Sequence, residues 1–172
     1  MKDKKESFIQ TKEYIKSKLE EEISRAKRNK QPIAVLIFDI NYDFFEKEYN
    51  IKWALHYSII KQLEVILKKV LRELDKAGKW SGETFTAIFP ETNLEGAFKA
   101  AERMREAVSN HEFLGDAKKE RVKVALNIGV AVYPINGINS DELFTSAHGA
   151  FIKAVDRGGN CTVVSDRILH KE

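Results

Sequence analysis

Apolar side chains recur along much of the chain at the three-to-four-residue spacing of a helix that buries one face. In the first such segment, Ile15, Leu19 and Ile23 are separated by Lys and Glu residues. In the last one, Ser140 precedes the apolar face, so we expect it to cap that helix. The pattern predicts helices over four ranges: 8–29, 53–74, 94–108 and 140–155.

Other segments follow the patterns of extended chain. Residues 33–38 are an unbroken apolar run, which is typical of a strand buried on both faces. Residues 122–134 alternate for most of their length, as a long strand does. Residues 39–50 are polar and aromatic, and we expect them to be partly helical. The predicted strands are 33–38, 76–80, 84–89, 122–134 and 161–165.

The order of these elements predicts an α+β fold. Strand, helices, two strands, helix and strand form the ferredoxin-like βαββαβ arrangement, with one more helix and strand appended. Written out, the order is βααββαβαβ. It indicates a central sheet of five mostly antiparallel strands flanked by helices.

Composition and charge narrow the class of protein. The chain has 172 residues, a net charge of +3 and one cysteine, Cys161. The charge is too small to indicate a nucleic-acid surface. One cysteine excludes an internal disulfide and suits a reducing compartment, so we expect a cytoplasmic protein. The first ten residues resemble no signal peptide, and no apolar run is long enough to span a membrane.

Two acidic residues are expected to meet at one edge of the sheet. In a βαββαβ sheet the first and third strands are antiparallel neighbours, so Asp39 at the end of one lies near Glu83 at the start of the other. Together with a backbone carbonyl near Ile40, these carboxylates form a candidate Mg²⁺ site. The alternative is structural. Ser81 and Gly82 are good hairpin residues, and acids at strand ends commonly face water.

Several segments together resemble the GGDEF domain of diguanylate cyclases. The turn SGETF resembles a degenerate form of the signature that gives the family its name. AVLIFDIN resembles the family's first strand, NIGVAVYP a later strand, and SAHGAFIKAVDRGGN its closing helix and turn. The turn SGETF consists of Ser81, Gly82, Glu83, Thr84 and Phe85.

The resemblance implies a nucleotidyl-cyclase fold and a known reaction. Family members join two GTP molecules into cyclic di-GMP, and each domain of a homodimer holds one GTP over two Mg²⁺ ions. Asp39 and Glu83 match metal-binding acids of the family, and Gly82 matches the second glycine of the signature. However, Ser81 replaces the first glycine and Thr84 replaces an acid. Asn41 replaces the second Asp of the family's Asp-x-Asp.

Positions that bind GTP in the family also differ. The position of a guanine-binding Asp falls near Tyr57, and a guanine-binding Asn falls near 48–50 without a secure equivalent. The phosphate-binding Lys aligns with Val155, and a following basic residue aligns with Gly159. Lys153 and Arg157 are the nearest cations in the sequence. Because several electrostatic contacts are lost together, we expect little catalysis. Mg²⁺ remains a doubtful cofactor and GTP a doubtful ligand. We interpret Glu83 as a vestigial catalytic and metal-binding residue.

A second family motif is retained. Arg72 and Asp75 match the RxxD inhibitory site, which binds cyclic di-GMP away from the catalytic pocket. Arg103 matches a position that supplies a second Arg. An Arg guanidinium can donate to guanine O6 and N7, and an Asp can accept from guanine N1–H and N2–H₂. The alternative is an ordinary surface ion pair at a helix end.

Three hypotheses follow from the sequence. The first is a catalytically impaired GGDEF signalling domain that acts as a cyclic di-GMP receptor through Arg72, Asp75 and Arg103. The second is an active diguanylate cyclase, and the third is a module that dimerises or binds a partner without nucleotide. We expect residues 1–30 to form a connector helix to an upstream sensor domain, and 31–172 to form the degenerate GGDEF domain.

Overall fold

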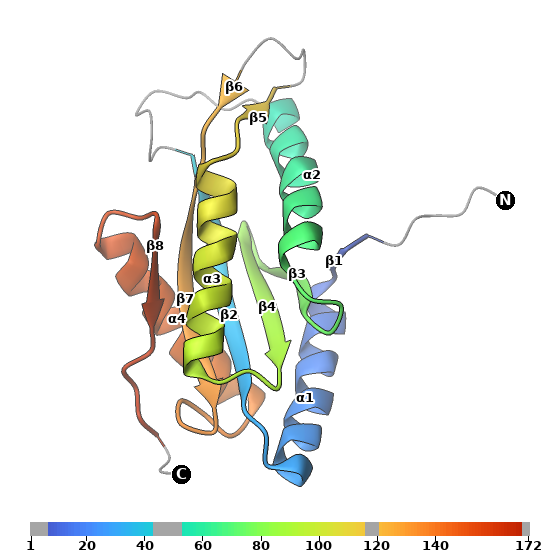
Figure 1. Cartoon of the computed structure of the whole chain (residues 1–172), viewed down its shortest axis with the longest axis vertical. Helices are drawn as coiled ribbons and strands as arrows, with labels where there is room; N and C mark the ends of the chain where they lie inside the picture. The colour runs from blue at the N-terminus through green and yellow to red at the C-terminus, as the bar shows by residue number, and fades with distance from the viewer. Residues whose placement is uncertain (1–6, 43–52, 116–120, 170–172) are drawn as a thin grey trace, which may run out of the picture.

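The computed structural model describes residues 7–42, 53–115 and 121–169, with only the backbone described for 53–55. A central sheet lies between two pairs of helices (Figure 1). The strands are β1 (Ile9–Gln10), β2 (Ile33–Asn41), β3 (Lys76–Ser81), β4 (Thr84–Pro90), β5 (Phe113–Leu114), β6 (Arg121–Val122), β7 (Ala125–Tyr133) and β8 (Cys161–Val164). The helices are α1 (Lys12–Asn29), α2 (Trp53–Val70), α3 (Leu94–Ser109) and α4 (Ser140–Asp156).

The main sheet has the strand order β1-β3-β4-β2-β7-β8. The four inner strands are antiparallel to their inner neighbours, and the edge strands β1 and β8 are parallel to β3 and β7. The α+β class and the pairing of the first and third predicted strands are therefore confirmed. The prediction of five strands is wrong by one: the described sheet has six, because β1 adds a two-residue edge strand. Two residues are too few to show alternation.

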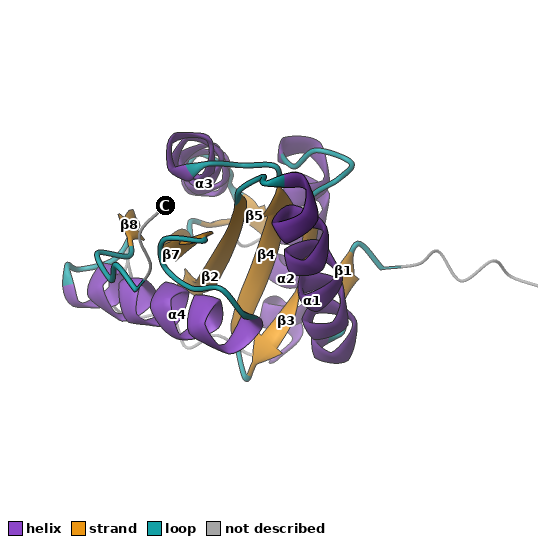
Figure 2. Ribbon diagram, turned by 90° about the horizontal axis from the view of Figure 1, so that it is seen from below, coloured by secondary structure: helices purple, strands orange, loops and turns teal. Residues whose placement is uncertain are grey.

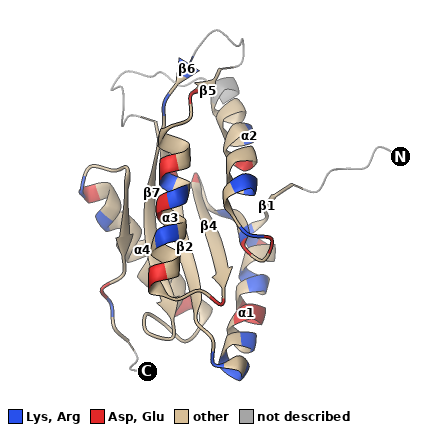
Figure 3. Cartoon of the chain, in the orientation of Figure 1, with Lys and Arg blue, Asp and Glu red and all other residues tan. Residues whose placement is uncertain are grey.

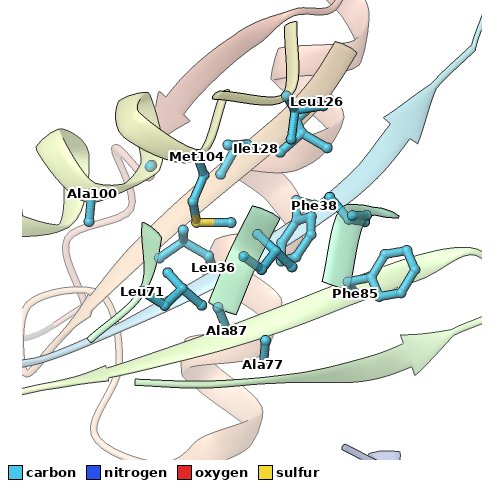
Figure 4. Packing of buried hydrophobic residues seen from close by; sticks show 14 of the residues in the cluster. Leu36, Phe38, Leu71, Ala77, Phe85, Ala87, Ala100, Met104, Leu126 and Ile128 are labelled. Atoms are coloured by element: carbon cyan, nitrogen blue, oxygen red, sulfur yellow. The ribbon is translucent and has the colours of Figure 1, made fainter. Parts of the chain in front are cut away.

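The two faces of the sheet bury separate apolar clusters. Side chains of α2 and α3 pack with Leu36 and Phe38 of β2 on one face, and Figure 4 shows part of that cluster around Met104. Side chains of α1 and α4 pack with Val35 and Ile37 on the other face. Figure 2 shows α3 and α4 on opposite sides of the sheet. The unbroken apolar run in β2 is thus explained by burial on both faces.

Several element boundaries differ from the prediction. Helix α1 starts at Lys12 rather than at residue 8, since Thr11 caps it by accepting a hydrogen bond from Tyr14 N. The cap of α4 is Asn139, whose Oδ1 accepts from Glu142 N, and Ser140 is instead the first helical residue. Both residue types cap well, and the extended backbone of Asn139 places its side chain correctly.

Two further boundaries differ from the prediction. Strand β7 begins at Ala125 rather than at residue 122, because residues 121–122 pair with 113–114 in a separate ribbon. Helix α2 ends at Val70, so residues 71–75 form a turn rather than the last helical turn. The helix expected within 39–50 falls mostly on residues 43–52, which lie outside the described part of the chain.

Charged residues lie mainly on the helices, and most residues of the sheet are uncharged (Figure 3). In α1 a polar surface faces away from the buried residues Ile15, Leu19 and Ile23. None of the described helices is both long enough and apolar enough to cross a bilayer.

Candidate functional site

The structure brings Asp39 and Glu83 to the same edge of the sheet. Strand β2 pairs with β4 as far as Phe38 opposite Phe85, and Asp39 to Asn41 then pair only with β7. The turn before β4 carries Glu83 at this open end. Burial raises the pKa of Asp39; a hydrogen bond from Asn127 partly offsets this, and the nearby charge of Glu83 raises the pKa further. The two acids are therefore electrostatic neighbours.

Asn127 on β7 organises this edge and was not singled out from the sequence. Its side chain is 3% exposed. Nδ2 donates to Asp39 Oδ1 at 2.9 Å, and Oδ1 accepts from Asn160 N at 3.0 Å. Only the register that sets Asp39 opposite Asn127 could have revealed the pair.

The signature turn is a tight hairpin held by its own side chains. Gly82 has φ +53°, a left-handed conformation that favours glycine. Thr84 Oγ1 donates to Ser81 O at 2.5 Å and accepts from Ser81 N at 3.2 Å. Phe85 is buried and stacks on Phe38 with ring centroids 5.5 Å apart. Thr84, in place of an acid, therefore closes the hairpin.

Tyr42 lies beside the two acids. Its hydroxyl and His56 Nδ1 are hydrogen-bonded. Burial and the negative charges of Glu83 and Asp39 strongly raise the pKa of Tyr42. The tyrosine thus stays protonated and adds no charge to the edge. The expected guanine-binding position near 48–50 lies outside the described residues, and Tyr57 is exposed on α2.

This edge offers a divalent metal fewer carboxylates than the family pattern has. Mg²⁺ prefers near-octahedral oxygen ligands, of which usually one or two are carboxylates and several are waters. Here Asp39 shares one oxygen with Asn127, Glu83 is exposed, and an amide, Asn41, stands where the family has a carboxylate. Within the described ranges, no three His, Cys, Asp or Glu side chains gather in a group suited to a metal. Ile40 is paired with Leu126 of β7.

The positions expected to hold phosphates offer little positive charge. Val155 is 42% exposed on α4. Gly159 has φ +84°, and a Cβ there would lie 2.5 Å from Asn41 Nδ2 and 2.7 Å from Asn127 Oδ1. A basic side chain at 159 would therefore require the turn to move. Lys153 Nζ is paired with Asp166 at 2.7 Å.

The remaining candidates gather in a second place. Arg72, Asp75 and Arg103 line one pocket of about 490 Å³, together with residues of the β4–α3 loop. We call it the Arg72 pocket. Arg103 is exposed, and its side chain forms no hydrogen bond or ion pair with the rest of the described chain. The spacing along the chain alone could not show that α3 brings Arg103 to the turn after α2.

Arg72 and Asp75 are locked together in this pocket. Asp75 is 2% exposed and accepts hydrogen bonds from Arg72 N, Nε and Nη2. Arg72 Nη2 also donates to Pro90 O and to Thr92 Oγ1. Both Asp75 oxygens are thus used, whereas Arg72 Nη1 donates no hydrogen bond in the described part of the chain. Asp75 therefore holds the guanidinium of Arg72 in place at the wall of the pocket.

The pKa of Asp39 predicts how one substitution changes stability. A raised pKa means that the folded protein binds this proton more tightly than the unfolded chain, so the free energy of unfolding falls as pH rises through that range. Asp39→Asn removes the charge and can still accept from Asn127. At about pH 7 we expect its melting temperature to exceed that of the parent protein modestly, because solvent still reaches this carboxyl and screens part of the effect of its charge.

The difference should disappear near pH 3.5 or below, roughly the ordinary pKa of Asp, as the carboxyl becomes protonated. Glu20→Gln, an exposed carboxylate on α1, is the matched control and should change the melting temperature little. Thermal melts at several pH values measure both. A lower melting temperature for Asp39→Asn at neutral pH would contradict the role given to burial.

Comparisons with known sequences agree with the fold and the motifs. Residues 8–161 match the family model described as diguanylate cyclase, GGDEF domain. The probable diguanylate cyclase DgcT of Escherichia coli K12 is 32% identical over 148 residues, which cover 84% of this chain and 32% of that protein. The chain spans about a third of the length of curated relatives that it matches, such as DgcT.

Comparisons with solved structures support the same fold. The GGDEF domain of YfiN, also called TpbB, from Pseudomonas aeruginosa superposes with a TM-score of 0.84 at 18% identity, covering 92% of this chain and 97% of that one. The GGDEF domain of DgcB from Caulobacter crescentus, solved in complex with cyclic di-GMP, has a TM-score of 0.78 at 18% identity, covering 92% and 89%. At these identities the likeness concerns the fold.

Proposed function

The chain belongs to the GGDEF family of diguanylate cyclases, and from that premise we propose that it is a catalytically impaired signalling domain that binds cyclic di-GMP in the Arg72 pocket. The observation that carries the proposal is the convergence of Arg72, Asp75 and Arg103 on one pocket. Two guanidinium groups there suit a ligand with two phosphates and two guanine bases.

Arg72 is held ready for such a ligand. Its hydrogen bonds to Asp75, Pro90 and Thr92 fix the guanidinium and leave the two N–H donors of Nη1. A donor group that is already oriented loses little entropy when a ligand binds. Arg103, without an ion pair in the described chain, adds a second positive charge. The pocket can therefore bind an anion without first breaking the Arg72–Asp75 pair.

The impaired state is supported at the other site. The edge of Asp39 and Glu83 supplies a poor set of metal ligands, and Val155 and Gly159 supply no cation for a triphosphate. Removing a single well-placed electrostatic contact can lower a rate about 10²–10³-fold. After several such losses, the domain would bind cyclic di-GMP without synthesising it.

Isothermal titration with cyclic di-GMP tests the receptor proposal. We expect saturable binding to the parent protein and at least about tenfold weaker binding by Arg103→Ala, because one charge-assisted contact is lost. Arg103 is the preferred residue to change because its side chain is exposed and forms no hydrogen bond or ion pair in the described chain, so its removal should not disturb folding.

The matched control is Arg121→Ala, an exposed arginine of the β5–β6 ribbon whose side chain is 72% exposed. It carries the same charge change but does not line the Arg72 pocket, so it should bind cyclic di-GMP like the parent protein. Absence of heat with the parent protein, or equal affinity in Arg103→Ala, would reject the receptor role.

A further inference from the structure

A second pocket lies next to the Arg72 pocket and contains neither of its arginines. It has a volume of about 660 Å³, within the range of sites that hold small organic ligands, about 300–1,000 Å³. It lies between the end of α1, the start of α3 and the loop after β7, and it shares Gln31, Pro32 and Asn93 with its neighbour. We call it the Lys27 pocket.

Most of its wall is apolar. Leu94 opens α3 and is 44% exposed, although the other large apolar residues of that helix's inner face are buried. Val132, at the end of β7, is 3% exposed. The apolar wall consists of Pro32, Leu94, Val132, Pro134 and Ile135. Such a wall favours an occupant with a hydrocarbon body.

The charge at the rim is positive. Lys27 and Lys30 line the pocket at the end of α1; both are exposed, and neither side chain forms an ion pair or hydrogen bond with any described residue. Figure 3 shows basic residues at this end of the helix. Glu95, the one acid in the lining, is paired with Lys99 at 2.7 Å. Two unpaired cations thus lie beside an apolar wall.

Hydrogen bonds fix the segments that form the walls of the Lys27 pocket. Asn136 is 4% exposed; its Oδ1 accepts from Val132 N and its Nδ2 donates to Arg167 O. Thr92 N donates to Pro32 O, which ties the loop before β2 to the loop before α3. Leu169 N donates to Ile135 O. These bonds form the pocket in advance, so a ligand need not order it.

We propose that the Lys27 pocket binds a small amphiphilic carboxylate, with its aromatic or short acyl body on the apolar wall and its carboxylate on Lys27 and Lys30. Neither lysine belongs to the acidic edge or to the Arg72 pocket. The proposal therefore does not depend on nucleotide binding. A carboxylate can form charge-assisted contacts with the lysines that an uncharged ligand cannot, and a fully polar ligand would gain nothing from the wall.

Fluorescence titration with 8-anilinonaphthalene-1-sulfonate, an aromatic anion, tests the site. We expect saturable binding that Lys27→Glu/Lys30→Glu weakens at least about tenfold, since two attractive charges become repulsive. Leu94→Ser should also weaken it. The matched control, Lys68→Glu/Lys69→Glu, makes the same charge change on exposed residues in the last turn of α2 and should bind the probe like the parent protein.

Competition then identifies the body of the ligand. Displacement of the probe by decanoate indicates an acyl carboxylate and displacement by 2-naphthoate an aromatic one; displacement by neither overturns the assignment. Equal probe affinity in Lys27→Glu/Lys30→Glu and in its control would also overturn it. Arg103→Ala should bind the probe normally, so loss of cyclic di-GMP binding and loss of probe binding separate the two pockets. Far-ultraviolet circular dichroism confirms that each variant is folded.

Discussion

Incubated with GTP and Mg²⁺, the protein should make cyclic di-GMP at least about 10³-fold more slowly than an active GGDEF domain. Two features of the structure account for this expected loss. Asp39 shares an oxygen with Asn127 where a metal would bind, and Asn41 replaces a second acid. On the phosphate side, Val155 carries no charge and the Gly159 turn packs against Asn41 and Asn127.

Chromatographic analysis of the nucleotides after a long incubation measures this rate, with an active GGDEF domain assayed beside it. Glu83→Ala should leave the low background unchanged. Val155→Lys alone should not restore activity, because the metal ligands and the position at 159 remain altered. Turnover comparable to the active domain, lost in Glu83→Ala, would contradict the proposal and establish the second hypothesis of the sequence analysis, an active cyclase.

The second large effect concerns the Arg72–Asp75 pair. We expect Arg72→Ala to lower the free energy of unfolding by about 3 kcal/mol, since it leaves the buried carboxylate of Asp75 without its cation. Asp75→Ala should cost less, about 2 kcal/mol, because the side chain of Arg72 is 49% exposed and water can solvate it. Arg72→Ala costs more because the partner that it leaves behind, Asp75, is buried, whereas Asp75→Ala leaves behind the half-exposed Arg72. Both substitutions remove the same ion pair.

Denaturation in urea measures both variants and the double variant Arg72→Ala/Asp75→Ala. The double variant should be destabilised by less than the sum of the single variants, because the second substitution removes the group that the first left unpaired. A cost below about 1 kcal/mol for each single variant, with additive effects, would show that the pair is an ordinary surface ion pair. A larger cost for Asp75→Ala than for Arg72→Ala would contradict the order expected from burial.

Much of the fold could be predicted because burial leaves a pattern in the sequence. The apolar run in β2 predicted a strand covered on both faces, and the helical stripe of Ile15, Leu19 and Ile23 predicted α1. Features that depend on two or three residues could not be predicted. The strand Ile9–Gln10 is too short to show a period, and Asn139 and Ser140 are both good caps.

The candidate sites were predictable in their members but not in their contacts. Family spacing indicated Arg72, Asp75 and Arg103, and the topology brings them to one pocket. The family spacing did not indicate that Asp75 is buried, nor that both of its carboxylate oxygens accept hydrogen bonds from Arg72. The predicted contact of Asp75 with guanine therefore requires the Arg72–Asp75 pair to open. Asn127 was missed because only strand register sets it opposite Asp39.

We propose above all that this domain binds cyclic di-GMP but no longer binds GTP. Thermal melting in the presence of each nucleotide tests this most directly. At about 100 times the dissociation constant, a ligand of the folded state adds about 2.7 kcal/mol and raises the melting temperature by several degrees. We predict such a rise with cyclic di-GMP and none with GTP and Mg²⁺. A rise with GTP and Mg²⁺ and none with cyclic di-GMP would contradict the account.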